Sequence, residues 1–233
     1  MPIRAHTFAT IALLSLLTGC ASLSEPDPRD PLEPMNRAVS RFNDTVDHVL
    51  FTPVAKGYKT VTPKPVRNGV RNFFSNLDDV NEFANDLLQF KVYDASSDLM
   101  RVAVNSSFGI LGIFDVASEM RLQKHNEDFG LTLGHWGVGS GPYLVLPVIG
   151  SSSFRDGVGL YVDSNYADPV YQLKDIASRN DALAVKFISR KADLLEASTV
   201  MEEAALDKYE FTRDFYLDRR EGQVHGGHPP EQE

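Results

Sequence analysis

An all-α fold is the class that the sequence predicts, and two observations support it. Apolar residues recur at intervals of three and four along most of the chain, as they do on one face of an α-helix. Prolines and capping residues stand between these stretches, at the places where helices begin and end. With 42% hydrophobic residues in a total of 233, the chain is long enough to form one sizeable domain.

The first helix is predicted to run from Met35 to Val49, because its apolar residues follow one another at helical spacing. Asp30, Pro31 and Glu33 come just before the apolar stripe or at its start. We expect them to supply an N-cap, a proline in the first turn and the carboxylate of an arrangement like a capping box.

Further helices are predicted along the rest of the chain. Pro53 and Pro65 each restart the chain, because proline is tolerated in the first turn of a helix but not in its interior. The residues around Leu77 separate two apolar stripes, and Asp94 precedes a third. The predicted helical stripes cover residues 66–77, 80–88, 95–106, 184–195 and 204–216.

The C-terminal end differs in composition from the predicted helices. From Arg219 onward it consists mainly of Gly, Pro, His and charged residues, which bury too little apolar surface to become ordered. We therefore expect residues 30–219 to form the helical domain and residues 220–233 to be a disordered tail. His225 and His228 could bind a metal weakly, but a structural site needs four ligands, and no metal site is predicted there.

The N-terminus resembles that of a bacterial lipoprotein. An uncharged apolar run, too short to span a bilayer, ends in Leu17-Thr18-Gly19-Cys20, which resembles a lipobox. We interpret residues 1–19 as a signal peptide, Cys20 as the lipidation site and residues 20–29 as a tether. An Asp directly after the lipidated cysteine would resemble an inner-membrane retention signal. Ala21 occupies that position here, which favours the outer membrane. The alternatives for Cys20 are a buried structural thiol and a catalytic nucleophile.

The charge balance is acidic, with 23 Lys and Arg against 32 Asp and Glu, a net charge of −9. Removing the signal peptide also removes Arg4, so that the predicted mature chain is more acidic still. Nucleic acid is therefore not a natural partner of this chain. Because the sequence holds a single cysteine, an internal disulfide cannot form.

Two segments without charged residues interrupt the helical pattern. Residues 129–154 lack charge if His135 is neutral, but their many glycines and two prolines forbid one regular membrane helix. Irregular backbone at membrane depth is tolerated where it is buried in protein or lines a wet cavity. This segment therefore suggests a pore.

The second uncharged segment, residues 102–114, ends in large apolar side chains and two glycines. We expect a hairpin that borders the channel and moves on its glycine hinges, and an ordinary core hairpin is the alternative. At most a small loss of stability is predicted when Gly109 or Gly112 becomes Ala, unless the glycine has a positive φ. The predicted gating residues are Asn105, Phe108, Gly109, Ile110, Leu111, Gly112, Ile113 and Phe114.

The sequence does not match known catalytic or nucleotide-binding motifs. The glycines in residues 137–141 lack the spacing and the following helix of a dinucleotide-binding loop. A Gly-x-Ser-x-Gly nucleophile elbow does not occur in the sequence. The acidic pairs Asp78-Asp79 and Glu202-Glu203 are interpreted as surface charges at helix starts or on polar faces. The sequence thus predicts neither an enzyme nor a cofactor.

Three stretches of sequence resemble the MlaA family, also called VacJ lipoproteins. They are Asp30-Pro31-Leu32-Glu33-Pro34-Met35-Asn36-Arg37, Pro65-Val66-Arg67-Asn68-Gly69 and the block of glycines and aromatic residues from Phe129 to Tyr143. The resemblance covers roughly residues 30–219, and the block of glycines and aromatic residues is its most specific part. The lipobox agrees with it independently.

The resemblance implies an all-helical ring that lies in the membrane interface around a central channel. It also implies transport: mislocalised phospholipid is taken from the outer leaflet of the outer membrane and passed to a periplasmic carrier protein, with trimeric porins as neighbours. Membrane-interface helices of this kind need amphipathic faces, which the sequence has. The residues expected close to the channel are Gly134, Trp136, Gly137, Gly139, Gly141 and Tyr143.

Two other functions stay open at this point. One is a structural envelope lipoprotein that binds porin. This role needs apolar helix faces, but it does not explain a long uncharged segment rich in glycine. A phospholipid hydrolase needs a nucleophile with a base, and the sequence offers no recognisable pair of this kind.

The lipobox leads to a direct prediction. Replacing Cys20 by Ser removes the thiol that lipid is attached to, so Cys20→Ser protein should not be acylated and should be unprocessed or mislocalised. Growth with labelled palmitate, followed by isolation of the protein, measures this. Incorporation of label into the Cys20→Ser protein at the level of the unmodified chain would show that Cys20 is not the lipidation site.

Overall fold

A computed structural model describes residues 27–226 of the chain. Cys20, the signal peptide and residues 227–233 lie outside the described residues. Helices dominate, so the predicted fold class is confirmed, and the one β-hairpin of the described residues includes the strand-like run from Tyr143 to Leu146. The elements are α2 (Glu33–Val46), a π-helical turn (Asp47–Phe51), α3 (Thr52–Val61), α4 (Lys64–Leu88), α5 (Val92–Ser107), α6 (Val116–Glu119), α7 (Phe129–His135), β1 (Tyr143–Leu146), β2 (Gly150–Ser153), α8 (Phe154–Val162), a second π-helical turn (Asp163–Ala167), α9 (Ile176–Ala204) and α10 (Lys208–Val224).

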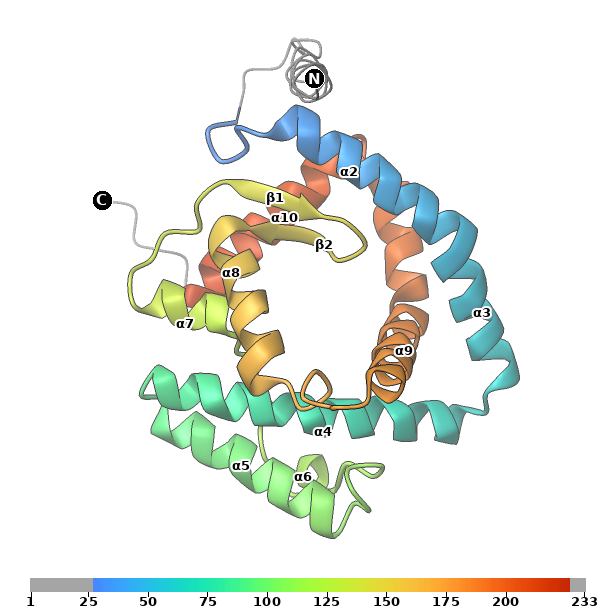
Figure 1. Ribbon diagram of the computed structural model, residues 1–233, viewed down its shortest axis with the longest axis vertical. Helices are drawn as coiled ribbons and strands as arrows, with labels where there is room; N and C mark the ends of the chain where they lie inside the picture. The colour runs from blue at the N-terminus through green and yellow to red at the C-terminus, as the bar shows by residue number, and fades with distance from the viewer. Residues whose placement is uncertain (1–26, 227–233) are drawn as a thin grey trace, which may run out of the picture.

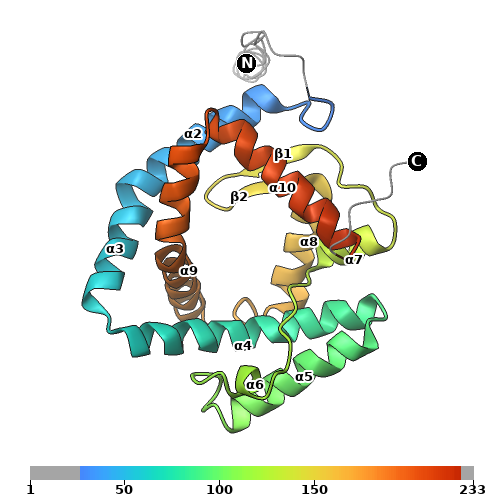
Figure 2. The ribbon, with the colours of Figure 1, turned by 180° about the vertical axis from the view of Figure 1, so that it is seen from behind.

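The elements form a ring (Figure 1). The arc of α2 and α3 forms one side, α4 forms the base, and α8, the β-hairpin and α10 form the other side and the top, with α9 inside the arc. Helix α9 contacts both α3 and α4, and α7 packs against α8 and α10. Helices α5 and α6 lie on the side of α4 that faces away from the ring in both views (Figures 1 and 2). Among the described residues, no helix joins the length and the apolar character that crossing a bilayer requires.

The arc of α2 and α3 is continuous where the sequence predicted a break. A π-helical turn, Asp47–Phe51, comes directly before Pro53. This wider turn absorbs a proline that has no N–H to donate, so the chain bends around the ring without leaving the helix. The predicted N-cap at Asp30 is wrong, because its buried carboxylate accepts hydrogen bonds from Asn36 Nδ2, at 2.8 Å, and from the hydroxyl of Tyr209.

Helix α4 is also longer than predicted. It runs for 25 residues without a break, through the residues around Leu77 that were expected to separate two helices. Those residues are favourable N-caps, but such residues do not force a helix to begin. Packing against α5, α9 and α7 keeps α4 helical through them.

The β-hairpin is fixed to α2 by one buried amide. Asn36 donates from Nδ2 to the carbonyl of Tyr143 at 2.9 Å and accepts at Oδ1 from the N–H of Val145 at 2.9 Å. Strands β1 and β2 pair antiparallel, with Tyr143 opposite Ser153. A small apolar cluster forms where the hairpin meets α10, and its buried members are Tyr143, Val145, Tyr209 and Leu217.

The predicted boundary between the helical domain and the tail is wrong by several residues, because α10 continues to Val224. Arg220 explains the difference, since it forms ion pairs with Asp128 at 2.6 Å and with Asp156 at 2.8 Å. These charge-assisted contacts order a segment whose apolar content is low.

The 105–114 hairpin is held by its own backbone. The N–H of Gly112 donates to the carbonyl of Asn105 at 2.9 Å, and that of Phe114 donates to the carbonyl of Gly109 at 2.9 Å. Ile110 and Leu111 have φ values of 52° and 56°, a strained region for such side chains. The hairpin is therefore a tightly specified turn.

Arg220 gives a prediction about stability. Arg220→Ala leaves the buried carboxylate of Asp156 without its main partner, so the free energy of unfolding should fall by about 3 kcal/mol near neutral pH. Burial raises the pKa of Asp156, but the hydrogen bond and charge of Arg220 more than offset this and lower it from 3.8 to about 2.

The pH dependence follows from the sign of that shift. The pair stabilises the fold above about pH 4, and this contribution is lost as pH falls from 4 toward 2. Denaturant unfolding of the variant and of the unmodified protein should therefore converge over that range. Arg219→Ala, at an exposed neighbouring position, is the control and should change stability little. An Arg220→Ala effect that persists unchanged at pH 2 would contradict the ion-pair explanation.

The hairpin glycines give a second prediction. Gly112 has a φ of +87°, and a Cβ added there would lie 2.6 Å from the Cβ of Asn76. A Cβ at Gly109 would meet the carbonyl oxygens of Phe114 and Asn105 far inside contact distance. The expected small cost of alanine is therefore wrong at Gly109, whereas the positive φ of Gly112 is the exception that the expectation allowed. Gly112→Ala should lower the free energy of unfolding by more than about 1 kcal/mol.

The matched control is Gly57→Ala in α3, where an added Cβ meets no atom within 4 Å. Alanine in a helix interior should stabilise by about 0.5–1 kcal/mol relative to glycine. Thermal unfolding of both variants measures the contrast. Equal stability of the Gly112→Ala and Gly57→Ala proteins would show that the turn tolerates a side chain.

Candidate functional site

A cavity with a volume of about 760 Å³, the size of a small-molecule site, lies inside the ring. Its walls come from α4, α8 and the following π-helical turn, α9, α10 and the turn between β1 and β2. A further wall comes from the segment between α6 and α7, residues 120–128, which we call the α6–α7 strap and of which residues 126–128 line the cavity. In Figure 2 the strap crosses α4 on its way to α7.

Basic side chains line the cavity on α9 and α10. On α9, Lys186 and Arg190 are four residues apart and lie on the same face of the helix. The Lys186 side chain is nearly buried, whereas that of Arg190 is 60% exposed. The cavity-lining basic residues are Lys186, Arg190, Lys191, Arg219 and Arg220.

Acidic side chains of the walls hold several of these cations. Asp78 pairs with Lys186 at 2.8 Å and with Arg190 at 2.6 Å. Asp168 also pairs with Lys186, at 3.0 Å. Burial raises the pKa of Glu82 to about 8, against the opposing effect of Lys124. The cavity therefore carries paired charges of both signs with an exposed guanidinium at Arg190.

Apolar side chains share the same walls. Val148 and Ile149, at the tip of the β-hairpin, are exposed large apolar residues. Facing segments add further apolar lining, so the cavity is amphipathic. The apolar and aromatic lining residues are Val148, Ile149, Leu160, Tyr171, Leu183, Phe187, Leu194 and Tyr216.

The 105–114 hairpin does not contribute to this lining. Asn105 is buried and holds the start of α6, accepting from the N–H of Ala117 at 2.8 Å. The turn itself lies against α4, where Ile113 meets Gly69 and Gly112 meets Asn76. Its tip exposes large apolar side chains on the side of α4 away from the ring. A gating role stays a prediction, in which the hairpin would act on the cavity through the neighbouring α4 or α6. The exposed side chains are Phe108, Ile110, Leu111, Ile113 and Phe114.

The residues expected close to the channel are also outside the cavity lining, although their segment reaches it through Val148 and Ile149. Gly134 is buried against Arg155 and Val224. Trp136 is exposed, and its indole donates to the carbonyl of Leu88 at 3.1 Å. Gly137, Gly139 and Gly141 belong to the loop that leads into β1, and Tyr143 is 1% exposed in the apolar cluster. Among these glycines, Gly137 and Gly141 have positive φ values.

One acidic pair was misinterpreted. Asp79 is fully buried, where it pairs with Arg101 at 3.2 Å and with Lys124. Its neighbour Asp78 holds two cavity cations, as described above. Neither residue is a simple surface charge, because the ring places both faces of α4 against other segments.

The basic residues of the cavity were not among the predicted site residues. The apolar pattern of residues 184–195 predicts a helix but does not indicate which charged residues share one of its faces. The spacing of Lys186 and Arg190 was a usable signal. The acidic partners from other elements carried no such signal, because they are brought together by the ring.

Large apolar side chains also cover the outside of the ring. Val49 is 75% exposed and Val61 79% exposed on the arc of α2 and α3. Phe90 and Tyr93, where α4 meets α5, are also highly exposed. With the hairpin tip, these exposed residues, none of which lines the cavity, are what we call the apolar outer rim; exposed apolar surface of this kind marks contact with a membrane or another protein.

Comparisons with known proteins agree with one another. A family model described as MlaA lipoprotein matches residues 28–223. The intermembrane phospholipid transport system lipoprotein MlaA of Escherichia coli (strain K12) is 34% identical over 225 residues, which cover 94% of this chain and 88% of that protein. The protein of the same name from Haemophilus influenzae is 30% identical, covering 96% of this chain and 92% of that protein.

A solved structure, described as the structural basis for maintenance of bacterial outer membrane lipid asymmetry, matches with a TM-score of 0.74 at 33% identity. The match covers 84% of this chain and 98% of the solved chain. The family model spans most of the chain, and the relatives are aligned over nearly their whole length. The chain therefore belongs to the MlaA lipoprotein family.

Proposed function

We propose that this protein is an outer-membrane lipoprotein that removes mislocalised phospholipid from the outer leaflet and passes it to a periplasmic carrier protein. The observation that carries the proposal is the amphipathic cavity inside a ring with an apolar outer rim. A phospholipid has an anionic phosphate and apolar chains, and the cavity offers cations beside apolar side chains. The names of the relatives, which describe intermembrane phospholipid transport, support this choice.

The location follows from the same features. Lipid on Cys20 would attach the chain to the outer membrane, on its periplasmic side, and the apolar rim would lie in the interface. A helix that does not span can bind there through its apolar face. A trimeric porin beside the ring would cover part of the rim, for which the exposed Phe90 and Tyr93 are suitable contacts.

The transfer needs no covalent chemistry, so we propose that the protein is not an enzyme. The phosphate of the lipid would exchange places with a wall carboxylate. Arg190 is the best placed cation, because its side chain is largely exposed and its partner Asp78 is also bound to Lys186. A structural porin-binding role without transport is the alternative, and it gives no use for the cavity.

Neutralising two exposed cavity cations tests the proposal. The double variant Arg190→Gln with Arg219→Gln should be normally abundant but poor in transport, because the attraction for the phosphate is weakened. Intact cells that carry the variant in place of the native copy are labelled with a membrane-impermeant amine reagent. Labelled phospholipid should rise toward the level of cells that lack the protein.

The matched control removes two exposed basic residues that do not line the cavity, in the double variant Lys56→Gln with Lys64→Gln. It should leave the labelling at the normal level. Normal labelling with the cavity variant at normal abundance would favour a structural role. Release of fatty acid from phospholipid by the purified protein would favour a hydrolase instead.

A further inference from the structure

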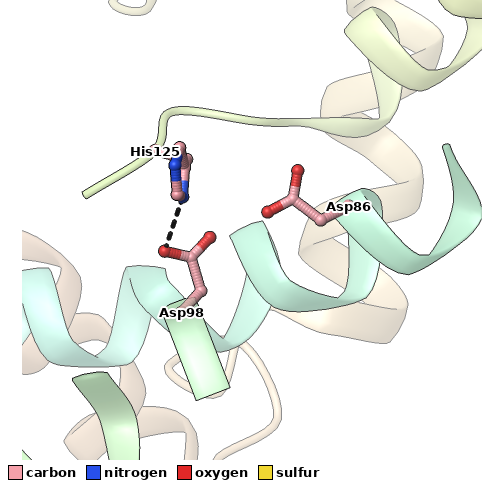
Figure 3. Close-up of side chains that lie close together, drawn as sticks. All are labelled: Asp86, Asp98 and His125. Atoms are coloured by element: carbon pink, nitrogen blue, oxygen red, sulfur yellow. Dashed lines mark hydrogen bonds and ion pairs between the residues drawn. The ribbon is translucent and has the colours of Figure 1, made fainter. Parts of the chain in front are cut away.

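Three ionisable side chains from separate segments come together on the outer side of α4, away from the cavity lining. They are Asp86 on α4, Asp98 on α5 and His125 on the α6–α7 strap (Figure 3). One ligand atom from each lies within 4.8 Å of the others. Nδ1 of His125 is 3.0 Å from Oδ1 of Asp98, and the carboxylate of Asp86 points toward both.

The two carboxylates are buried and incompletely bonded. Asp86 and Asp98 are both 0% exposed. Within the described residues, neither carboxylate oxygen of Asp86 has a hydrogen-bond partner, and Oδ2 of Asp98 has none. A buried carboxylate is very costly unless it is paired, protonated or bound to a metal. His125 contacts one oxygen of Asp98, and the three other carboxylate oxygens are open to a neutralising group between Asp86 and Asp98.

A proton or a cation could fill that role. A proton shared between the two carboxyl groups would remove one of their two negative charges. A proton satisfies a single contact between the two carboxyl groups. It leaves the second carboxylate oxygen of Asp86 without a partner and makes no use of the His125 ring beyond its contact with Asp98.

We propose that Asp86, Asp98 and His125 bind a divalent transition-metal ion, with Zn²⁺ as the best match. Two carboxylate oxygens and one imidazole nitrogen are a common donor set for zinc, whereas Mg²⁺ and Ca²⁺ prefer oxygen alone. Ligand atoms of tetrahedral zinc lie about 3.3 Å apart, so binding would draw Asp86 inward by roughly an ångström. Water would occupy the fourth position.

A fourth side chain completes the arrangement. Nε2 of His125 is 3.5 Å from Oδ1 of Asp94. Histidines that bind metal through one ring nitrogen usually donate from the other to a carboxylate, which fixes the ring and raises its basicity. Asp94 is placed for this role. The His125 side chain is 18% exposed, which gives an ion a route to the buried carboxylates.

The ion would tie three segments together at a place that affects the cavity. Asn126, Glu127 and Asp128 follow His125 directly and line the cavity wall. Asp128 also pairs with Arg220 at 2.6 Å. Metal binding would therefore hold the strap against α4 and α5 and keep this wall in place. The inference does not depend on which ligand the cavity carries.

Zinc titration of the full-length lipoprotein in detergent tests the proposal. After treatment with a chelator, the protein should bind one Zn²⁺ per chain by calorimetry, and its melting temperature should rise with zinc concentration. His125→Ala should weaken binding at least about 100-fold, and Asp94→Asn about 10–100-fold. Circular dichroism checks that each variant is folded, and Asp98→Asn, which keeps the side-chain shape, should also lose the zinc.

The control is the double variant His225→Ala with His228→Ala, because two histidines near the C-terminus could bind zinc on their own. It should keep the site and the melting shift. Equal zinc affinity in the His125→Ala protein, or no shift on adding zinc, would overturn the proposal, as would binding of Mg²⁺ without Zn²⁺. Asp86→Asn protein as stable as the unmodified chain, with no response of either to zinc, would show that a shared proton fills the site.

Discussion

A ring around an amphipathic cavity has no central apolar core, and this constraint decides what joins its helices. Buried polar residues outnumber buried apolar ones among the described residues, and the apolar cluster around Tyr143 serves one junction alone. The other junctions use buried charges, such as Asp79 with Arg101 and Asp156 with Arg220. A buried charge without its partner costs several kcal/mol, so each junction tolerates one arrangement of partners.

This constraint explains why helices could be predicted from the sequence better than their surroundings. Apolar spacing located the stripes of α2 to α5 correctly, but it could not say that Val49 is exposed. Periodicity reports that one face is apolar, not whether protein or lipid covers it. The predicted helix ends are wrong where a contact with a residue distant in sequence outweighs the local preference. Asp30 binds Tyr209 instead of capping α2, and Arg220 orders the end of α10.

The candidate site was less predictable than the fold, for a related reason. Glycine-rich, uncharged sequence signalled unusual backbone, and the structure does place irregular backbone in residues 136–142. Glycine-rich sequence does not distinguish closely packed backbone from residues that line a cavity. Gly134 is packed against Arg155, whereas Val148 in the same segment lines the cavity. Lining residues from α4, α9 and α10 are far apart in sequence, and their meeting is a property of the closed ring.

The constraint also links the outer rim to the cavity. Helices α2, α3 and α4 are strongly amphipathic, so turning their polar side chains toward the junctions and the cavity leaves apolar ones such as Val61 exposed. In water this surface would cost about 25 cal/mol for each Å² exposed. The proposed membrane interface removes that cost and so replaces the missing core. A ring stabilised from outside can keep a wet, charged interior, which a domain of the same size built around an apolar core could not.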